Sequence, residues 1–221
     1  MKYKEEGEWK EYWGKSDDSL FGKICHLDRI YVISFYVRHI LDKYFPKKGI
    51  FVETGCGSAE SSMRIEKHKR KFYALDISEK ALEMAKKIKI FDKRIKADIF
   101  HMPFKKESID GLWNLGVMEH FDEREIIKIM NEFHRVLKKG SYTILFWPPV
   151  FGSSSIVLNS YEWFMKKILK KKVWIRPEEK TQIKSIEHIK RLINRTKFSL
   201  YRWHFSYRDL FTHFVVVCKK I

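Results

Sequence analysis

Short strand-like segments alternate with amphipathic stretches through the middle of the chain. Five segments predict strands: 50–52, 72–75, 94–97, 108–115 and 141–147. Three stretches between them carry apolar side chains at helical spacing: 59–69, 78–90 and 121–137. Strands that alternate with helices in this way predict a parallel sheet with right-handed helical crossovers, so the central part of the chain indicates an α/β fold.

The first part of the chain follows a purely helical pattern. Residues 24–45 repeat apolar side chains mostly in steps of three or four, which predicts one or two amphipathic helices stopped by Pro46 and Gly49. We expect residues 1–47 to form an N-terminal helical cap. Residues 48–221 then form the main domain, and the two parts make a single compact unit.

The last third departs from the strand–helix alternation. An insertion spans about residues 151–180, and residues 184–196 predict a further helix. Residues 199–206 and 210–219 predict two strands whose short connection leaves no room for a crossover helix. The sheet should therefore finish with an antiparallel strand.

The composition is that of a folded protein. The chain has 221 residues, of which 44% are hydrophobic, enough for a core without disulfide or metal staples. It has no uncharged run of the ~18 residues that a membrane span needs, and its first ten residues lack an apolar signal-peptide core. The three cysteines and nine histidines show no metal-ligand spacing. We expect a reduced, cytoplasmic protein without a metal.

The charge is strongly basic. Lys and Arg number 45 against 28 Asp and Glu, which gives a formal net charge of +17. Such a balance suits a polyanionic partner, either nucleic acid or an acidic membrane surface. It equally suits a lysine-rich composition spread over solvated faces.

A glycine turn follows the first predicted strand. Gly55 and Gly57 stand at a strand end, where ligands of parallel sheets bind. Glycines permit a tight turn and close approach of a ligand, and we expect the next helix to direct its N–H groups into the same space. Asp76, 19 residues after Gly57, ends the second strand, and Asp98 ends the third. A carboxylate at the position of Asp76 can accept both hydroxyls of a ribose.

The carboxylates distinguish between two adenosine cofactors. A dinucleotide site favours a third glycine three residues after Gly57, where Glu60 stands. The pyrophosphate of a dinucleotide is also disfavoured by the Glu53 carboxylate. Glu53, Asp76 and Asp98 together suit a ligand with positive charge and sugar hydroxyls. S-adenosylmethionine carries an ammonium, a sulfonium and a ribose, so we expect it to be the cofactor.

These motifs resemble those of the class I S-adenosylmethionine-dependent methyltransferases, of the small-molecule type. The resemblance covers roughly residues 48–147 and the terminal strand pair. The segment 53–59 stands where the family has an acidic residue and then three alternating glycines, with Ala59 in place of the third. The segment 132–141 is similar to the family's Arg-Val-Leu-Lys-Pro-Gly-Gly stretch, with Lys139 in place of proline.

The resemblance implies an enzyme with a Rossmann-like three-layer sandwich. Its seven-stranded, mostly parallel sheet has the order 3-2-1-4-5-7-6, with an antiparallel last strand and helices on both faces. The implied cofactor contacts are Glu53, Gly55, Cys56, Gly57, Asp76, Ile77, Asp98 and Ile99. We add Asn114, because the backbone and side chain at the end of the fourth strand can meet the methionine moiety.

A general base is needed only if the methyl acceptor arrives protonated. His120 follows the fourth strand, near where the methyl group should emerge, and is our candidate for a catalytic residue. Glu119 and His101 are alternatives. We expect His204 and His213 to lie on strands.

We expect the acceptor to be a small or lipid-linked molecule, methylated by in-line displacement. In the resembled family, the N-terminal helices and the insertion select it. The insertion mixes bulky apolar residues with lysines, so three interpretations stay open. It lies on an anionic membrane, it grips phosphates while aromatic rings stack on bases, or it forms a lid helix.

Two other classes of function stay open as well. An RNA methyltransferase is favoured only by the net charge. A non-catalytic module that uses the fold for binding is disfavoured by the intact set Gly55, Gly57, Asp76 and Asp98.

Overall fold

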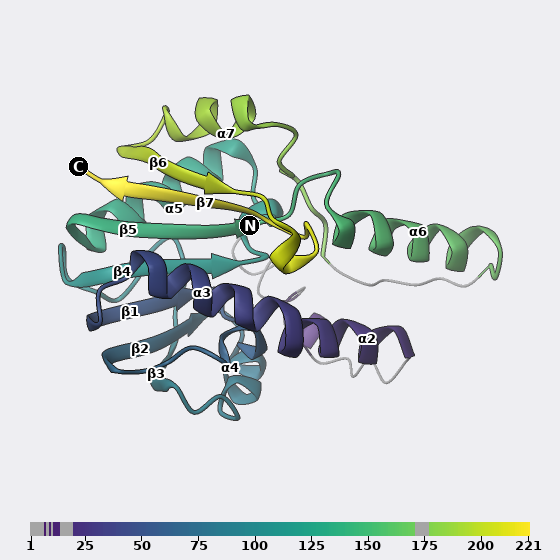
Figure 1. The fold of residues 1–221 in the computed structure, drawn as a ribbon, viewed down its shortest axis with the longest axis horizontal. Coiled ribbons are helices and arrows are strands. Elements are labelled where there is room, and N and C mark those ends of the chain that lie inside the picture. The colour runs from purple at the N-terminus through teal and green to yellow at the C-terminus, as the bar shows by residue number, and fades with distance from the viewer. Residues whose placement is uncertain (1–6, 8, 10, 14–19, 171–176) are drawn as a thin grey trace.

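A seven-stranded sheet forms the centre of the computed structural model, which describes residues 7, 9, 11–13, 20–170 and 177–221 (Figure 1). The strands are β1 (Lys48–Thr54), β2 (Lys69–Asp76), β3 (Phe91–Lys96), β4 (Ile109–Leu115), β5 (Leu137–Trp147), β6 (Phe198–His204) and β7 (Phe214–Lys220). Their order is β3-β2-β1-β4-β5-β7-β6, and β7 runs antiparallel to both of its neighbours. The predicted fold, strand order and antiparallel last strand are confirmed.

Helices cover both faces of the sheet, because its strands are apolar on both sides. One core cluster unites Phe51, Phe72 and Trp113 with apolar residues of α3 (Ser34–Tyr44) and α4 (Glu79–Ala85). The other unites strand residues of the opposite face with α5 (Glu123–Val136) and α7 (Ile186–Ile193). The result is a three-layer sandwich (Figure 1).

The longest predicted helix of the sheet domain begins and ends for identifiable reasons. Asp122 caps α5, since its carboxylate accepts from the N–H groups of Arg124 and Glu125, and Glu125 returns a bond to the Asp122 backbone. The helix gives way directly to β5, which begins at Leu137 and not at residue 141 as predicted. Leu137 already pairs with Ile109 across a register shift in this strand pair.

Two predicted helices are shorter in the structure. The segment 59–69 holds a single 3-10 turn, η2 (Glu60–Ser62), because Ala59 adopts a left-handed φ of 56°. No α-helix follows the glycine turn in the described segment 58–69, so the expectation that such a helix directs its N–H groups into the site is wrong. The helix that begins after Ser78 ends at Ala85, where the guanidinium of Arg94 binds its carboxyl-terminal carbonyls.

The N-terminal helical stretch is confirmed and contains an irregularity. Helix α2 (Leu20–Asp28) passes through a π-helical turn, η1 (Arg29–Ile33), into α3. Such turns inside helices often occur at functional sites. The division into a cap at 1–47 and a main domain at 48–221 stays a prediction.

The insertion contains α6 (Ser153–Lys167), and its residues 171–176 lie outside the described part of the chain. Figure 1 shows α6 extending away from the sheet beyond the carboxyl ends of the strands, in the same direction as α2. A 3-10 turn, η4 (Tyr207–Asp209), joins β6 to β7. Among the described helices, none is long and apolar enough to span a membrane.

Candidate functional site

A cavity of about 550 Å³ lies at the carboxyl ends of the strands. Its walls come from the ends of β1, β2 and β4, from the segment after β3, and from α2, η1, the start of α6 and the connection between β6 and β7. The cavity therefore lies at the edge of the sheet where parallel folds bind ligands.

All but one of the predicted site residues line this cavity. They are Glu53, Gly55, Cys56, Gly57, Asp76, Ile77, Asp98, Ile99 and His120. Asn114 does not line it: its side chain is fully buried behind the cavity wall, and its amide nitrogen and oxygen have no hydrogen-bond partner in the described part of the chain. The role predicted for Asn114 stays a prediction.

The glycine turn is tight and closely covered. Gly55 and Gly57 adopt left-handed φ angles of 65° and 53°, which side chains rarely tolerate. The backbone N–H of Gly55 donates to the carbonyl of Leu75, which ties the turn to the end of β2. A Cβ on Gly57 would lie 2.4 Å from the ring of Trp13. Only glycine therefore fits between this turn and the Trp13 ring that covers it.

Asp76 fixes the turn to the end of β2. One carboxylate oxygen accepts from the N–H of Gly57 at 2.9 Å, and the other accepts from the N–H of Ser78 at 2.8 Å. Burial raises the pKa of Asp76, and these backbone hydrogen bonds oppose the rise. A carboxylate oxygen accepts more than one hydrogen bond, so Asp76 keeps lone pairs for a ligand.

Glu53 is the most deeply buried carboxyl group of the cavity wall, with 2% of the residue exposed. Its carboxylate accepts from the Ser62 hydroxyl at 2.8 Å. Burial raises the pKa of Glu53 to about 8, and the nearby carboxylate of Asp76 adds to the rise, while Ser62 and Trp113 oppose it. A cation bound beside Glu53 would therefore stabilise the ionised form that burial disfavours.

Asp98 completes the acidic set. It follows β3 and accepts from the N–H of Phe100 at 3.0 Å. Because β3, β2 and β1 are neighbours in the sheet, Asp98, Asp76 and Glu53 reach the same cavity from adjacent strand ends. The predicted gathering of three carboxylates around the glycine turn is what the structure has.

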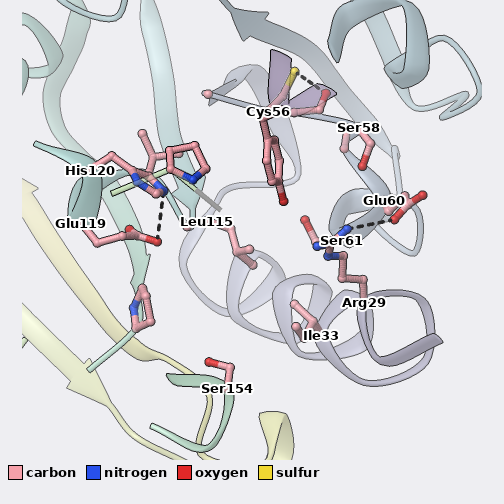
Figure 2. Close-up of a pocket in the computed structure, with 18 of the residues that line it drawn as sticks. Arg29, Ile33, Cys56, Ser58, Glu60, Ser61, Leu115, Glu119, His120 and Ser154 are labelled. Carbon is pink, nitrogen blue, oxygen red and sulfur yellow. Dashed lines mark hydrogen bonds and ion pairs between the residues drawn. The ribbon is translucent and has the colours of Figure 1, made fainter. Parts of the chain in front are cut away.

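His120 lies on a different wall of the cavity (Figure 2). Its Nδ1 donates to the carbonyl of Glu178 at 2.9 Å, and its Nε2 is 3.9 Å from the Glu119 carboxylate. The ring also meets Trp9 edge to face, with 4.9 Å between centroids. In Figure 2, Arg29 and Glu60 stand on the opposite side, joined by an ion pair at 3.8 Å. That pair holds the π-helical turn against the glycine loop.

Sequence reasoning missed two groups of cavity residues. Trp9 and Trp13 line the cavity from the N-terminal segment, which the sequence presents as polar with interspersed aromatic residues. His213 lies just before β7, not on it, and also lines the cavity beside the buried Asp209. The four-residue spacing of Asp209 and His213 was the available signal for this pair.

Comparison with known proteins agrees with this geometry. Residues 52–145 match a family described as a methyltransferase domain. These residues therefore resemble a methyltransferase domain. The matched segment runs from β1 into β5 and so includes the glycine turn and all three carboxylates of the cavity.

Two curated relatives resemble about half of this chain. An uncharacterized protein of Methanocaldococcus jannaschii is 33% identical over 108 residues, which cover 48% of this chain and 44% of that protein. The malonyl-[acyl-carrier protein] O-methyltransferase of Hamiltonella defensa is 30% identical over 116 residues, 52% of this chain and 44% of that enzyme. The alignments thus span less than half the length of these relatives.

The fold extends the likeness beyond the methyltransferase domain. The magnesium protoporphyrin IX methyltransferase of Synechocystis, solved with bound SAH, superposes with a TM-score of 0.63 at 16% identity. The superposition covers 97% of this chain and 94% of that enzyme. The chain therefore shares the fold of that enzyme over nearly its whole length.

The cavity residues fit S-adenosylmethionine. The donor set is acidic, with a buried carboxyl group whose ionised form needs a cation, and Asp76 retains acceptor capacity for hydroxyl groups. The glycine turn lines the same cavity, with the Trp13 ring packed against Gly57. Glu53 would hold the amino group, Asp76 the ribose, and Asp98 with Ile99 the adenine side.

Proposed function

We propose that this protein transfers a methyl group from S-adenosylmethionine to an acceptor held beneath α2 and α6. The observation that carries the proposal is the buried Glu53 carboxyl group, which shares one cavity with Asp76 and Asp98 beside a left-handed glycine turn. Burial raises the pKa of both Glu53 and Asp76, so a bound cation would stabilise the ionised forms of these two carboxyl groups.

The residues of this chain contribute mainly alignment. When bound, S-adenosylmethionine supplies an electrophilic methyl group on a sulfonium. Glu53 would hold the amino group of the bound cofactor, and Asp76 would hold its ribose. Trp9 and Trp13 exclude water from that space. Alignment of this kind supplies up to about 7–11 kcal/mol in well-oriented reactions.

Calorimetry with S-adenosylhomocysteine, the demethylated product, tests this function without knowledge of the acceptor. The expected result is a single site with a dissociation constant in the micromolar range, about −8 kcal/mol at 1 μM. Absence of binding at millimolar product, with the fold intact by circular dichroism, would contradict the proposal.

For the acceptor, we infer a small or lipid-linked molecule drawn from an anionic membrane surface. Helix α6 supports this inference, because Ser155 is its one buried residue in the described structure. Large apolar side chains on α6 face solvent, among them Trp163, with 59% of the residue exposed. Lys166 and Lys167 stand in its last turn. Exposed apolar side chains beside lysines suit insertion among anionic headgroups.

The helical stretch from α2 through η1 into the start of α3 presents a second exposed apolar stripe. Ile24, Leu27, Tyr31 and Phe35 follow one another at helical spacing and are each about half exposed or more. The rings of Phe21 and Tyr161 stack at 4.1 Å and so join α2 to α6 over the cavity mouth. A cavity that opens between two apolar, basic arms suits an acceptor that is partly embedded in lipid.

Cosedimentation with vesicles tests the inference about the membrane. We expect binding to phosphatidylcholine vesicles that contain phosphatidylglycerol, weak binding to phosphatidylcholine alone, and loss of most binding in Trp163→Glu. The control is Ile221→Glu, which changes an exposed apolar residue to the same charge beyond the end of β7. Equal binding by both variants, or salt-sensitive binding to RNA in place of vesicles, would contradict a lipid surface as the partner.

A further inference from the structure

A second polar constellation in the cavity has no part in the cofactor contacts proposed above. The ring of His213 lines the cavity near the end of β5, and the carboxylate of Asp209 lies beside it with the residue fully buried. The Asp209 Oδ2 atom is 3.1 Å from Nδ1 of His213 and also accepts from the His213 backbone N–H at 2.9 Å. The carboxylate therefore fixes both the position and the orientation of this imidazole.

The turn that creates this geometry is strained and anchored. Leu210 and Phe211 both adopt left-handed φ angles, 56° and 57°, which are costly for side chains of their kind. The turn is anchored to the start of α6 by the Ser153 N–H, which donates to the Phe211 carbonyl at 3.2 Å, and by a hydroxyl contact between Ser153 and Thr212 at 3.0 Å. Consecutive strained residues that persist in one place indicate a functional constraint.

The hydrogen bonds also decide which ring nitrogen carries the proton. A carboxylate only accepts, so Nδ1 of His213 donates to Asp209. The other nitrogen, Nε2, then carries the lone pair of the neutral imidazole. The ring of Phe146 meets the imidazole edge to face at 6.2 Å and supports this orientation. The arrangement is that of a base held by a buried carboxylate.

The groups that face the imidazole are consistent with a proton acceptor. Asp28, at the end of α2, also lines the cavity; burial raises its pKa, and the neighbouring His213 and Arg29 oppose the rise. Tyr36 of α3 is a buried neighbour of Asp209, and burial raises its pKa as well. Both carboxylates, of Asp28 and Asp209, would stabilise the imidazolium that forms when the ring accepts a proton.

We propose that His213 is the general base of the methyl transfer, that Asp209 is its positioning residue, and that the acceptor is a neutral molecule with an O–H or N–H group. This proposal rests on the proposed function. It assigns the proton of the acceptor to His213, while His120, which is held by the Glu178 carbonyl, shapes the opposite wall.

The proposed step forms one bond to the methyl carbon and breaks one. A lone pair on the acceptor oxygen or nitrogen forms the bond to the methyl carbon, and the carbon–sulfur bond breaks with its electron pair going to sulfur. The acceptor proton passes to Nε2 of His213. The resulting imidazolium is stabilised by the Asp209 carboxylate, and the product is a neutral ether or amine. A base of this kind contributes about 10²–10⁴-fold to the rate.

Chemical modification tests the state of the ring without cofactor or acceptor. Diethyl pyrocarbonate attacks unprotonated imidazole nitrogens, and mass spectrometry of peptides resolves the site. We expect His213 to react although only 4% of the residue is exposed, and to react several-fold more slowly in Asp209→Asn. An inert His213, alongside normal reaction of the exposed His68, would overturn the proposal.

Labelled S-adenosylmethionine then tests catalysis with two matched probes. Phenol is neutral below pH ~10, as the tyrosine side chain is, and needs a base, whereas phenylacetate is already ionised at neutral pH. His213→Asn keeps a donor toward Asp209 but removes Nε2. We expect it to lower transfer to phenol about 10²–10⁴-fold and to leave transfer to phenylacetate within about twofold. The control is His68→Asn. His68 is exposed and has a left-handed backbone conformation, which Asn also tolerates.

The pH profile separates a base from a structural role. The rate of methyl transfer to phenol by the wild-type protein should rise with pH and then level off once the imidazole is deprotonated. The rate for His213→Asn should keep rising until phenol itself ionises near pH ~10. Identical profiles, or equal loss with phenol and phenylacetate, would overturn the proposal. Calorimetry with S-adenosylhomocysteine distinguishes failure of this proposal from failure of the proposed function. If His213→Asn binds the product normally, the proposed function stands even where the role of His213 as base does not.

Discussion

The two sides of the cavity are built in opposite ways. On the side of β1, β2 and β3, Glu53 and Asp76 are buried, Asp98 is half-buried, and all three carboxylates accept hydrogen bonds from backbone N–H groups or from Ser62. On the side of α2 and α6, large apolar residues face solvent, and the one described stacking contact between the helices joins Phe21 to Tyr161. A site for one fixed ligand needs polar side chains that are held in place by hydrogen bonds, as on the side of β1, β2 and β3. A site that admits a variable or lipid-bound acceptor tolerates apolar side chains that face solvent, as on the side of α2 and α6.

The largest expected effect comes from breaking the first side at Asp76. Asp76→Ala removes the acceptor for the Gly57 N–H and the proposed acceptor for the ribose. We expect S-adenosylhomocysteine to bind about 100-fold more weakly, as two charge-assisted hydrogen bonds require. Calorimetry measures this directly. The control is Asp92→Ala, which removes a carboxylate that accepts a backbone N–H outside the cavity; equal losses in both variants would contradict a specific role for Asp76.

A smaller effect is expected at the glycine turn. Gly57→Ala introduces both a left-handed alanine and a Cβ 2.4 Å from the Trp13 ring. Gly140→Ala introduces only the first, because open space surrounds Gly140. Both variants should lose about 1 kcal/mol of stability from backbone strain. We expect Gly57→Ala alone to lose affinity for S-adenosylhomocysteine, by about tenfold. Unchanged affinity would mean that the Trp13 ring moves aside without any effect on product binding.

The smallest effect is expected at Ser62. Ser62→Ala removes the hydroxyl that donates to Glu53, so the pKa of this carboxyl group should rise further and less of it is ionised at neutral pH. Product affinity should fall about threefold to tenfold, the scale of one hydrogen bond. Ser61→Ala in the same turn is the control. A loss of equal size there would assign the effect to packing in the turn and not to Glu53.

The sequence predicts the side of the cavity formed by β1, β2 and β3 better than the side formed by α2 and α6. Strand ends, glycines and acidic residues lie within short segments, so Glu53, Asp76 and Asp98 could be placed together from strand spacing alone. The helix expected after the glycine turn is absent, because the left-handed Ala59 and the bond from Ser62 to Glu53 compete with helical geometry. Helical periodicity contains no information about such competition.

The residues that the sequence did not reveal reach the cavity over long chain distances. Trp13 lies over Gly57, 44 positions later, in a segment without apolar periodicity. His213 was expected on a strand, but the left-handed Leu210 and Phe211 turn it toward Asp209. Neither contact has a periodic signature, since each depends on tertiary packing or on backbone angles that the residue types disfavour.

The central claim is that the buried Glu53 carboxyl group binds the amino group of the cofactor, and the pH dependence of product binding tests it most directly. The pKa of free Glu53 is raised to about 8, so binding that requires its ionised form must release a proton below that pH. Wild-type affinity for S-adenosylhomocysteine should increase up to about tenfold per pH unit from pH ~6 to ~8. In Glu53→Gln the affinity should be weak and independent of pH over this range. Equal pH dependence in both proteins would contradict the claim.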